Sequence, residues 1–383
     1  MRLEQCYRTG DFRLLAKRRL PAPIFHYIDG GADDEVTMRR NSDAFSAVDL
    51  VPNVLTGVDA VDLSTTVFGR TLGMPLFMSP TAMQRLFHHD GEWALAHAAE
   101  QLDTMFGVST IGTTSIEELG ARCRAAKLFQ IYVHNDPGLT NDLIARCKAA
   151  RFDALALTVD TIVAGNRERD YRTGMTTPPK LTLRSMASFL AHPHWLANYL
   201  LRPKFDLPNI SRSIDLGSRV QSSVVDYIDR QMKRSISWDD AARMIDAWGG
   251  PFAIKGVMSV EDARRALDIG ASAIMVSNHG GRQLDGSRAP FDQVAAIADA
   301  VGGDIEIILD GGIRRGTHVL KALAAGATAC SGGRLYLYAL AAAGTAGVER
   351  AMRLLKAEIE RDMLLMGCRT TGDLQRSMLA PRA

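Results

Sequence analysis

Several common sequence signals are missing from this 383-residue chain. The five cysteines lie far apart and form no C-x-x-C pair, so neither a disulfide framework nor a zinc site is indicated. No run of about twenty apolar residues occurs anywhere, and residues 1–20 do not contain the continuous apolar core of a secretory signal. These absences predict a cytoplasmic protein in a reducing compartment.

A strong charge of one sign is also absent. The formal net charge is +2 and no run of five like charges stands out, which argues against nucleic acid as a partner. The 46% hydrophobic and 23% charged fractions are typical of a soluble globular protein. A chain of this length can form either two ordinary domains or one elaborated barrel.

What the sequence does contain is a repeated short apolar run that ends in turn or polar residues, as buried strands do. The runs cover residues 74–80, 104–110, 127–133, 154–160, 252–257, 273–278, 305–312 and 327–333. Helical patterns separate most of them, at residues 91–102, 115–126, 139–150, 238–248, 259–270 and 316–326. Several of these patterns start on Ser or Thr and stop at Gly, as helix capping predicts.

Near-continuous apolar strands that alternate with helices predict an α/β fold with a closed (β/α)8 TIM barrel. An open doubly wound sheet is the alternative, but no G-x-G-x-x-G motif follows an early strand. We expect one domain over residues 1–383, with an N-terminal helical extension (1–73), the barrel (74–357) and a C-terminal tail (358–383). Residues 161–236 interrupt the alternation after the fourth strand and are expected to form a loop insertion.

Polar side chains gather where the predicted strands end, which is where such barrels hold their chemistry. They are Thr81, Ser109, Gln130, Tyr132, Thr158, Asp160, Lys255, His279, Asp310 and Arg334. After the last two strands, "DGGIRRG" (310–316) and "SGGRLY" (331–336) each combine two glycines with arginine. Either motif alone also fits a simple turn, but the pair on consecutive strands predicts a phosphate site.

Lys255 and His279 are the candidate reactive groups. Lys255 fits a Schiff-base lysine, a group that stabilises negative charge on a cofactor ring, or a lysine that is merely ion-paired. His279 alone fits a satisfied loop histidine, but Asp160 can orient its imidazole and Arg282 can bind a carboxylate. Together they predict proton abstraction next to a carboxylate, with a phosphate-bearing cofactor as the electron acceptor.

The sequence resembles the FMN-dependent L-2-hydroxy acid dehydrogenases and oxidases, which include L-lactate dehydrogenase, glycolate oxidase and mandelate dehydrogenase. The resemblance covers nearly the whole chain. It is carried by "LPAPIFHYIDGGADDE" (20–35), "SPTAMQ", "FQIYV", "LTVDT", "IKGV", "SNHGGRQLDG", "DGGIRRG" and "SGGR". The segment "SNHGGRQ" is highly specific for this family. In the family the strand before it ends at the substrate, which explains why a buried strand is followed by a base and an arginine.

The resemblance implies a role for each matching residue. His279 is the base and Asp160 its partner; Arg282 and Arg167 bind the substrate carboxylate. Tyr27 and Tyr132 hydrogen-bond the substrate, although without the resemblance Tyr27 fits helix packing equally well. The implied FMN contacts are Pro80, Thr81, Ala82, Ser109, Gln130, Thr158, Lys255, Ser277, Asp310, Gly311, Gly312, Arg314, Gly333 and Arg334, with Lys255 stabilising the reduced flavin.

The implied reaction is oxidation of an L-2-hydroxy acid to the 2-oxo acid. Ile111 stands where glycolate oxidases carry Trp, which favours L-lactate as substrate. Ala82 occurs in oxidases and leaves the use of oxygen open, whereas other segments resemble bacterial dehydrogenases and favour a quinone or cytochrome as acceptor. The family also implies a homotetramer. The alternatives are an oxidase that makes hydrogen peroxide, a mandelate-type dehydrogenase, a Schiff-base lyase and a phosphate-ligand binding barrel.

The segment 181–205 combines apolar with basic residues in a way that suits a membrane interface. An equally simple interpretation is a helix that packs over the active-site mouth or at a subunit contact. Resemblance to the membrane dehydrogenases favours peripheral attachment to the inner face of the cell membrane. The residues concerned are Leu183, Met186, Phe189, Leu190, Trp195, Leu196, Tyr199, Leu200 and Leu201 with Arg184, Arg202 and Lys204.

Overall fold

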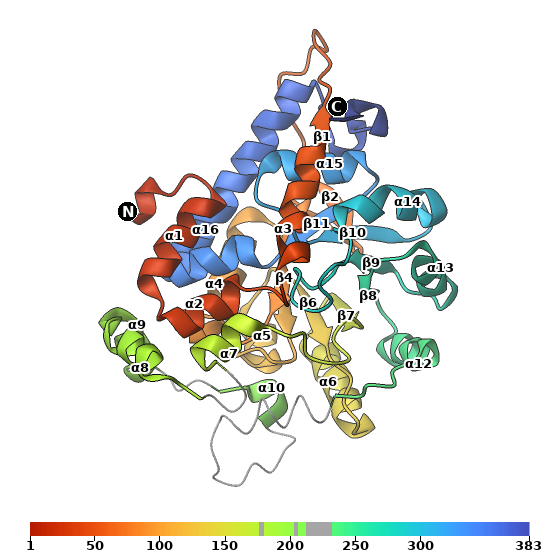
Figure 1. The fold of residues 1–383 in the computed structure, drawn as a ribbon. Helices are drawn as coiled ribbons and strands as arrows, with labels where there is room; N and C mark the ends of the chain where they lie inside the picture. The colour runs from red at the N-terminus through yellow and green to blue at the C-terminus, as the bar shows by residue number, and fades with distance from the viewer. Residues whose placement is uncertain (176–179, 203–205, 212–231, 383) are drawn as a thin grey trace.

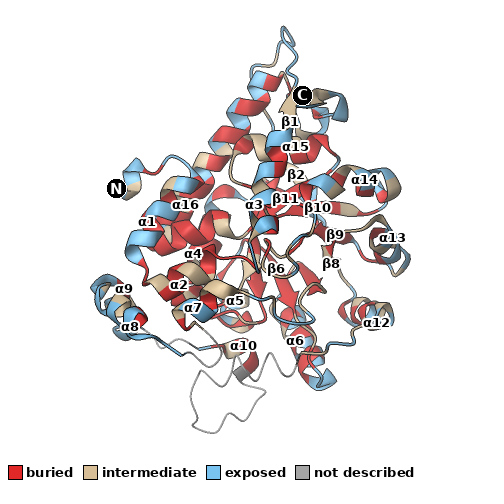
Figure 2. Ribbon diagram, viewed as in Figure 1, coloured by how far each residue is buried: buried red, intermediate tan, exposed pale blue. Residues whose placement is uncertain are grey.

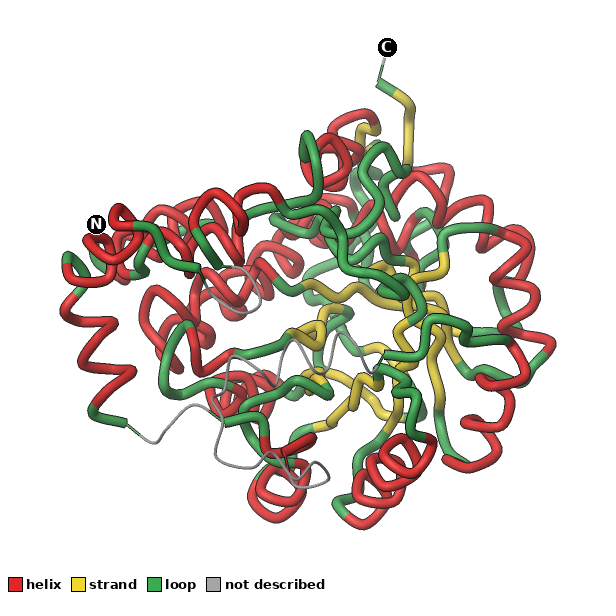
Figure 3. The backbone as a smooth tube through the Cα atoms, turned by 60° about the horizontal axis from the view of Figure 1, so that its bottom comes forward, coloured by secondary structure: helices red, strands yellow, loops and turns green. Residues whose placement is uncertain are grey.

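The central element of the fold is a closed barrel of eight parallel strands (Figures 1 and 3). The computed structural model describes residues 1–175, 180–202, 206–211 and 232–382. The strands follow one another around the barrel in chain order, so the predicted (β/α)8 TIM barrel is confirmed. They are β4 (Leu76–Thr81), β5 (Met105–Ser109), β6 (Ala126–Ile131), β7 (Ala154–Thr158), β8 (Phe252–Val257), β9 (Ala273–Val276), β10 (Glu306–Asp310) and β11 (Ala329–Gly332).

The barrel strands are apolar because one side of each faces the barrel interior and the other faces the helices. Every residue of β5, β6, β7 and β9 is buried, as the red strands in Figure 2 show. A short hairpin of β2 (Thr65–Val67) and β3 (Arg70–Leu72) packs its apolar residues against the interior side chains. Its Phe68 N–H donates to Glu306 at the start of β10, so the hairpin closes the N-terminal end of the barrel.

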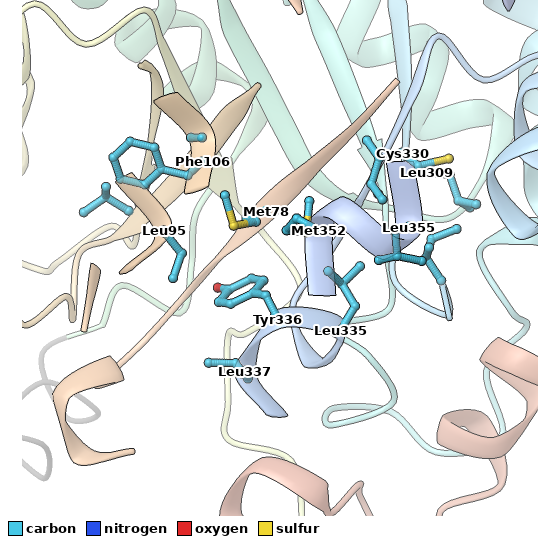
Figure 4. Close-up of a cluster of buried hydrophobic side chains, with 14 of the residues drawn as sticks. Met78, Leu95, Phe106, Leu309, Cys330, Leu335, Tyr336, Leu337, Met352 and Leu355 are labelled. Carbon is cyan, nitrogen blue, oxygen red and sulfur yellow. The ribbon is translucent and has the colours of Figure 1, made fainter. Parts of the chain in front are cut away.

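Six of the helices that follow the barrel strands match the six helical stretches predicted from the sequence; α14 and α16 were not among the predicted stretches. The helices that follow the strands are α4 (Glu92–Leu102), α5 (Ile116–Arg122), α6 (Pro137–Ala149), α12 (Trp238–Trp248), α13 (Val260–Asp268), α14 (Phe291–Val301), α15 (Gly316–Ala324) and α16 (Arg334–Met366). Ser115, Ser237 and Ser259 cap α5, α12 and α13 by accepting a backbone N–H in the first turn. Apolar residues of α16, among them Tyr336 and Met352, pack against strand residues such as Met78 and Leu309 (Figure 4).

The N-terminal residues form helices α1 (Thr9–Arg19), α2 (Ala22–Asp29) and α3 (Val36–Asp43). Helix α1 packs along α16, and α2 contacts both α16 and α7 (Glu168–Thr173). Strand β1 (Val48–Leu50) pairs antiparallel with β12 (Leu379–Pro381), so the last strand of the chain is joined to the N-terminal region. Short 3-10 turns lie at Leu3–Gln5, Ala44–Ala47, Gln84–Leu86, Thr371–Asp373 and Arg376–Met378.

Between β7 and β8 the described residues also include α8 (Leu183–Leu190), α9 (Pro193–Leu200) and α10 (Pro208–Ser211). Helix α8 packs on α2, where the Ala22 N–H donates to Ser188 Oγ at 2.9 Å. Helix α9 is held to the barrel by the Trp195 indole, which donates to the Leu86 carbonyl at 2.8 Å. Within the described residues, no helix is long and apolar enough to cross a membrane.

Candidate active site

The register of the strands brings the predicted polar residues together at the C-terminal end of the barrel. Ser109 pairs with Gln130, Thr158 with Lys255, and Asp310 with Ser331. Pro80 and Thr81 end β4, and Ala82 follows it; Ser277 follows β9. The loop after β10 carries Gly311, Gly312 and Arg314, and Gly333 and Arg334 lead from β11 into α16. The residues that sequence assigned to a cofactor therefore surround one mouth of the barrel.

An imidazole and a carboxylate form a pair at this mouth. His279 Nδ1 lies 3.0 Å from Asp160 Oδ1, and the two side chains are 25% and 12% exposed. The His279 backbone is left-handed (φ 56°), as are the two glycines after it, and its N–H donates to Ser277 Oγ at 3.1 Å. A non-glycine residue rarely adopts this conformation outside constrained sites. The arrangement fixes Nδ1 on Asp160 and leaves Nε2 to exchange a proton.

Two residues that sequence reasoning left without a role hold Asp160 in position. Gly256 has φ 113°, and a Cβ there would lie 2.8 Å from the Asp160 Cβ, so no side chain fits. The Gln283 amide donates to the Asp160 carbonyl at 3.0 Å and to the Val163 carbonyl at 2.8 Å. Both residues stand inside the family-like motifs "IKGV" and "SNHGGRQLDG", which were the available signal.

Two guanidinium groups lie over the ring of Tyr27. The Arg282 and Arg167 Cζ atoms are 4.9 and 5.5 Å from its centroid. Burial and the like charge of Arg167 lower the pKa of Arg282 to about 10, so it stays charged at neutral pH. Arg167 is also 3.3 Å from Asp170. Two cations so close together favour binding of an anion between them, and guanidinium groups bind carboxylates in bidentate geometry.

Tyr132 belongs to the same cluster. Burial first, and then the charge of Asp160, raise the pKa of its phenol, while Arg282 and Arg167 act in the opposite direction. The phenol therefore keeps its proton at neutral pH and can donate a hydrogen bond. Its backbone N–H donates to Thr110 Oγ1 at 3.1 Å, which fixes the chain just after β6.

Lys255 is buried in an ion pair with Asp310. Its ammonium also donates to Ser277 Oγ at 3.0 Å. Asp310 accepts further hydrogen bonds from Ser277 and Ser331, at 2.8 Å each, and from Ser79. Burial raises the pKa of the Asp310 carboxyl group. The Lys255 charge and the hydroxyl donors lower this pKa by more, so that it lies below its ordinary value. An ion-paired ammonium is not the free amine that a Schiff base requires, so the lyase alternative is disfavoured.

A cavity of about 420 Å³ lies beside the loops after β10 and β11. Its lining is rich in arginine: Arg8, Arg13, Arg169, Arg314, Arg315 and Arg334, together with Asp29 and Tyr338. Arg334 donates to the carbonyls of Ile28, Gly280 and Gly30 at 2.6–2.9 Å, and Arg13 pairs with Asp29. Such a concentration of guanidinium groups suits a phosphate.

The residues at the mouth fit FMN. Within the part of the chain that the structure describes, Gln130 Nε2 and Thr158 Oγ1 are buried without a hydrogen-bond partner, and each such group costs about 1–3 kcal/mol. A polar ring edge beside β6 and β7 would satisfy both, while the phosphate would bind among the arginines. Gly107 of β5 lets the Pro80 backbone approach closely, because a Cβ on residue 107 would lie 2.4 Å from the Pro80 nitrogen.

These features fit a (β/α)8-barrel oxidoreductase with a phosphate-bearing cofactor. The chain belongs to the FMN-dependent dehydrogenase family, whose model matches residues 16–381. It is an FMN enzyme that oxidises the CH–OH group of a 2-hydroxy acid.

Relatives with different substrates resemble the chain to a similar degree. L-lactate dehydrogenase of Vibrio cholerae is 39% identical over 375 residues, which is 98% of this chain and 99% of the relative. Glycolate oxidase 1 of Oryza sativa is 38% identical over 367 residues, 96% of this chain and 94% of the relative. The crystal structure of the monotopic membrane protein (S)-mandelate dehydrogenase superposes with a TM-score of 0.94 at 32% identity, covering 99% of this chain and 100% of that one.

Proposed function

We propose that the enzyme oxidises an L-2-hydroxy acid, with L-lactate as the preferred substrate, and passes the electrons to a quinone or cytochrome. The observation that carries the proposal is the His279–Asp160 pair beside the two guanidinium groups on Tyr27. A base and a carboxylate clamp at one barrel mouth suit a substrate whose carboxylate is adjacent to the reacting carbon.

Each residue then has a defined task. Arg282 and Arg167 bind the carboxylate, and the phenol groups of Tyr27 and Tyr132 hydrogen-bond the substrate oxygens. His279 Nε2 takes a proton from the substrate, and Asp160 stabilises the resulting imidazolium. FMN, when bound, would accept the two electrons removed at C2 together with the second of the two protons that leave the substrate. The Lys255 ammonium stabilises negative charge that develops on the cofactor ring.

The preference for L-lactate rests on Ile111. Its backbone N–H donates to Ser109 Oγ at 3.2 Å and its carbonyl accepts from Met83 N–H at 2.9 Å, so the residue is held between the ends of β4 and β5. An aliphatic side chain there suits the methyl group of lactate. L-lactate should therefore reduce the flavin anaerobically with a higher kcat/KM than glycolate or L-mandelate. A higher kcat/KM for either competitor would contradict the choice of lactate.

The electron acceptor is tested in the second half-reaction. Enzyme reduced by substrate should be reoxidised faster by a soluble quinone or cytochrome than by dissolved oxygen. The opposite order would favour the oxidase alternative, with which Ala82 is compatible. The homotetramer implied by the resemblance stays a prediction, and light scattering of the purified protein measures it.

Replacing Lys255 with methionine should slow flavin reduction and weaken sulfite binding to the flavin about tenfold or more, because both place negative charge on the ring. The variant should also unfold at lower temperature, since loss of one partner leaves the buried charge of Asp310 uncompensated at a cost of about 3–5 kcal/mol.

The matched control is Lys127→Met, at the start of β6. This lysine is also buried, but its ammonium donates to the Cys123 and Ala125 carbonyls at 3.2 Å. The control should lose stability and keep its sulfite affinity. Unchanged sulfite affinity in Lys255→Met would remove that lysine from the flavin ring.

We also propose that α8 and α9 attach the protein to the inner face of the cell membrane. Leu183, Leu190, Leu200 and Leu201 are each at least 70% exposed, and Met186 is also exposed. Arg184 and Arg202 are exposed beside them. Trp195 is instead buried, and Phe189, Leu196 and Tyr199 are partly buried against the core. Lys204 lies outside the described residues. The outward set combines apolar and basic groups, which favours an anionic membrane surface.

The triple variant Leu190→Ser, Leu200→Ser, Leu201→Ser should lose most of its binding to vesicles of anionic lipid at low salt, while flavin reduction by substrate stays unchanged. Co-sedimentation with vesicles measures this. Leu364→Ser with Leu365→Ser, two exposed positions on α16, is the matched control and should bind as the parent does. If the intact enzyme fails to bind such vesicles, α8 and α9 form a lid or a subunit contact instead.

A further inference from the structure

A cluster of two histidines and an aspartate lies outside the site described above. His88, His89 and Asp90 lie between β4 and α4, and their side chains are 17%, 27% and 24% exposed. The two imidazole rings lie side by side with centroids 4.5 Å apart. One nitrogen of each ring and one oxygen of Asp90 all lie within 4.8 Å of one another.

Hydrogen bonds determine the role of each imidazole nitrogen. The Asp90 backbone N–H donates to His88 Nδ1 at 3.3 Å, so this nitrogen carries a lone pair. Asn198 Nδ2 donates to the His194 carbonyl at 3.3 Å. The amide oxygen Oδ1 of Asn198 is therefore the atom that lies 2.6 Å from His89 Nδ1. His89 Nδ1 must then be the donor, and in the neutral ring Nε2 carries the lone pair.

Both nitrogens lie close to the Asp90 carboxylate, and an ion on His88 Nδ1 would replace the long hydrogen bond from the Asp90 N–H. His88 Nδ1 lies 3.5 Å from Oδ2, and His89 Nε2 lies 3.1 Å from Oδ1. An unprotonated imidazole nitrogen and a carboxylate oxygen repel each other when no proton lies between them. A cation bound to both would remove this repulsion. Two ligand atoms held at about 2.0–2.2 Å by one tetrahedral Zn²⁺ would be about 3.3–3.6 Å apart, which is close to both separations.

Helix α16 contacts the cluster and orients one of its side chains. Asp90 Oδ2 accepts from the Thr345 backbone N–H and Oγ1, both at 2.8 Å, which orients the carboxylate. Helix α16 departs from helical geometry at Ala343 and Gly344 just before this contact. Gly344 has φ 57°, and a Cβ there would lie 2.4 Å from both Asp90 Oδ2 and His88 Cε1. Only a glycine therefore lets α16 approach the cluster this closely.

We propose that His88, His89 and Asp90 bind one divalent transition-metal ion of the Zn²⁺ class. Two imidazole nitrogens and a carboxylate are ligands that such ions prefer. Asn198 and Thr345 act as outer hydrogen-bond partners that orient His89 and Asp90, as is common around protein metals. The ion would tie together the three residues of the loop before α4, and this loop is linked to α16 through Thr345 and to α9 through Asn198. Its role is to fix the insertion helix on the barrel, and the assignment does not depend on the substrate or the acceptor.

The test uses the purified FMN-containing enzyme after treatment with a chelator. Calorimetric titration with Zn²⁺ should show one equivalent bound, and Co²⁺ as a spectroscopic substitute should give the absorption of a mixed nitrogen and oxygen site. His89→Gln should weaken Zn²⁺ binding by at least about tenfold, and Asn198→Ala by about tenfold, the range seen for outer-shell partners. His97→Gln removes an exposed histidine from α4 and should change nothing.

Hydrogen exchange gives a second readout. Zn²⁺ should slow exchange of the α9 amides in the parent and in His97→Gln, but not in His89→Gln. Asp90→Asn is the second ligand variant and should also lose the ion, with flavin content showing that it has folded. Absence of stoichiometric binding in the parent, or equal affinity in His89→Gln, would overturn the proposal and leave His89 and Asp90 as a simple ion pair.

Discussion

Replacing His279 with glutamine should leave FMN bound but slow anaerobic flavin reduction by the substrate at least about 10³-fold. The imidazole is the proposed base at the barrel mouth, and a positioned base contributes roughly 10²–10⁴-fold to rate. The proposed phosphate contacts, Arg314 and Arg334, line a cavity to whose lining His279 does not belong, which is why cofactor content should not change. Stopped-flow absorbance of the flavin after mixing with L-lactate measures the effect.

Asp160→Asn is the companion variant. It keeps the base but loses the carboxylate that lies 3.0 Å from His279 Nδ1. Its effect should be smaller than that of His279→Gln, because orientation and charge stabilisation weaken while the proton acceptor remains. Near-normal flavin reduction by His279→Gln would show that another group takes the proton.

Arg282→Met should weaken the binding of substrate and of propionate, which lacks the reacting hydroxyl, by about 100-fold or more. A hydrogen bond to a charged group contributes about 1.5–3 kcal/mol, and a bidentate guanidinium makes two of them. Arg167→Met should have a smaller effect. Perturbation of the flavin spectrum by propionate measures both affinities without turnover.

The control for this prediction is Arg288→Met, an exposed arginine six positions along the chain, which should leave both affinities unchanged. FMN content should stay normal in all three variants, since the clamp lies over Tyr27 rather than in the phosphate cavity. If propionate binds to both the Arg282 and the Arg167 variant as tightly as to the parent enzyme, the carboxylate site has been misassigned.

The barrel was predictable because its signal is local. Each strand is a short apolar run with polar or turn residues after it, and the run 273–278 ends in the same Ser277 and Asn278 that close β9. Helices α14 and α16 were not among the predicted helical stretches. The order of strands then followed from the alternation alone.

The site was only partly predictable from residues. His279, Asp160 and Lys255 carry a positional signal, because they stand at or just after strand ends. Tyr27 and Arg167 have no such signal: they come from α2 and from the loop before α7, and only the family resemblance pointed to them. Gly256 was missed because its close contact with Asp160 depends on tertiary structure, which spacing in the sequence does not reveal.

The segment 181–205 shows the same limit. Its apolar residues are evenly mixed in the sequence, yet Trp195 is 8% exposed and Leu201 is 81% exposed. Which side of α8 packs on α2 and which side of α9 faces the barrel are decided by tertiary contacts, such as that between the Trp195 indole and the Leu86 carbonyl. The composition of the segment indicated a mixture of apolar and basic residues, but it could not show which of them are buried and which are exposed.

The most direct test of the account is anaerobic mixing of the FMN enzyme with the two enantiomers of lactate. One fixed carboxylate clamp and one base on a fixed side of the substrate allow only one hand of the substrate to present its C2 hydrogen correctly. We predict full bleaching of the oxidised flavin by L-lactate and none by D-lactate on the same timescale. Equal reduction by both, or no reduction by any L-2-hydroxy acid, would contradict the proposed active site.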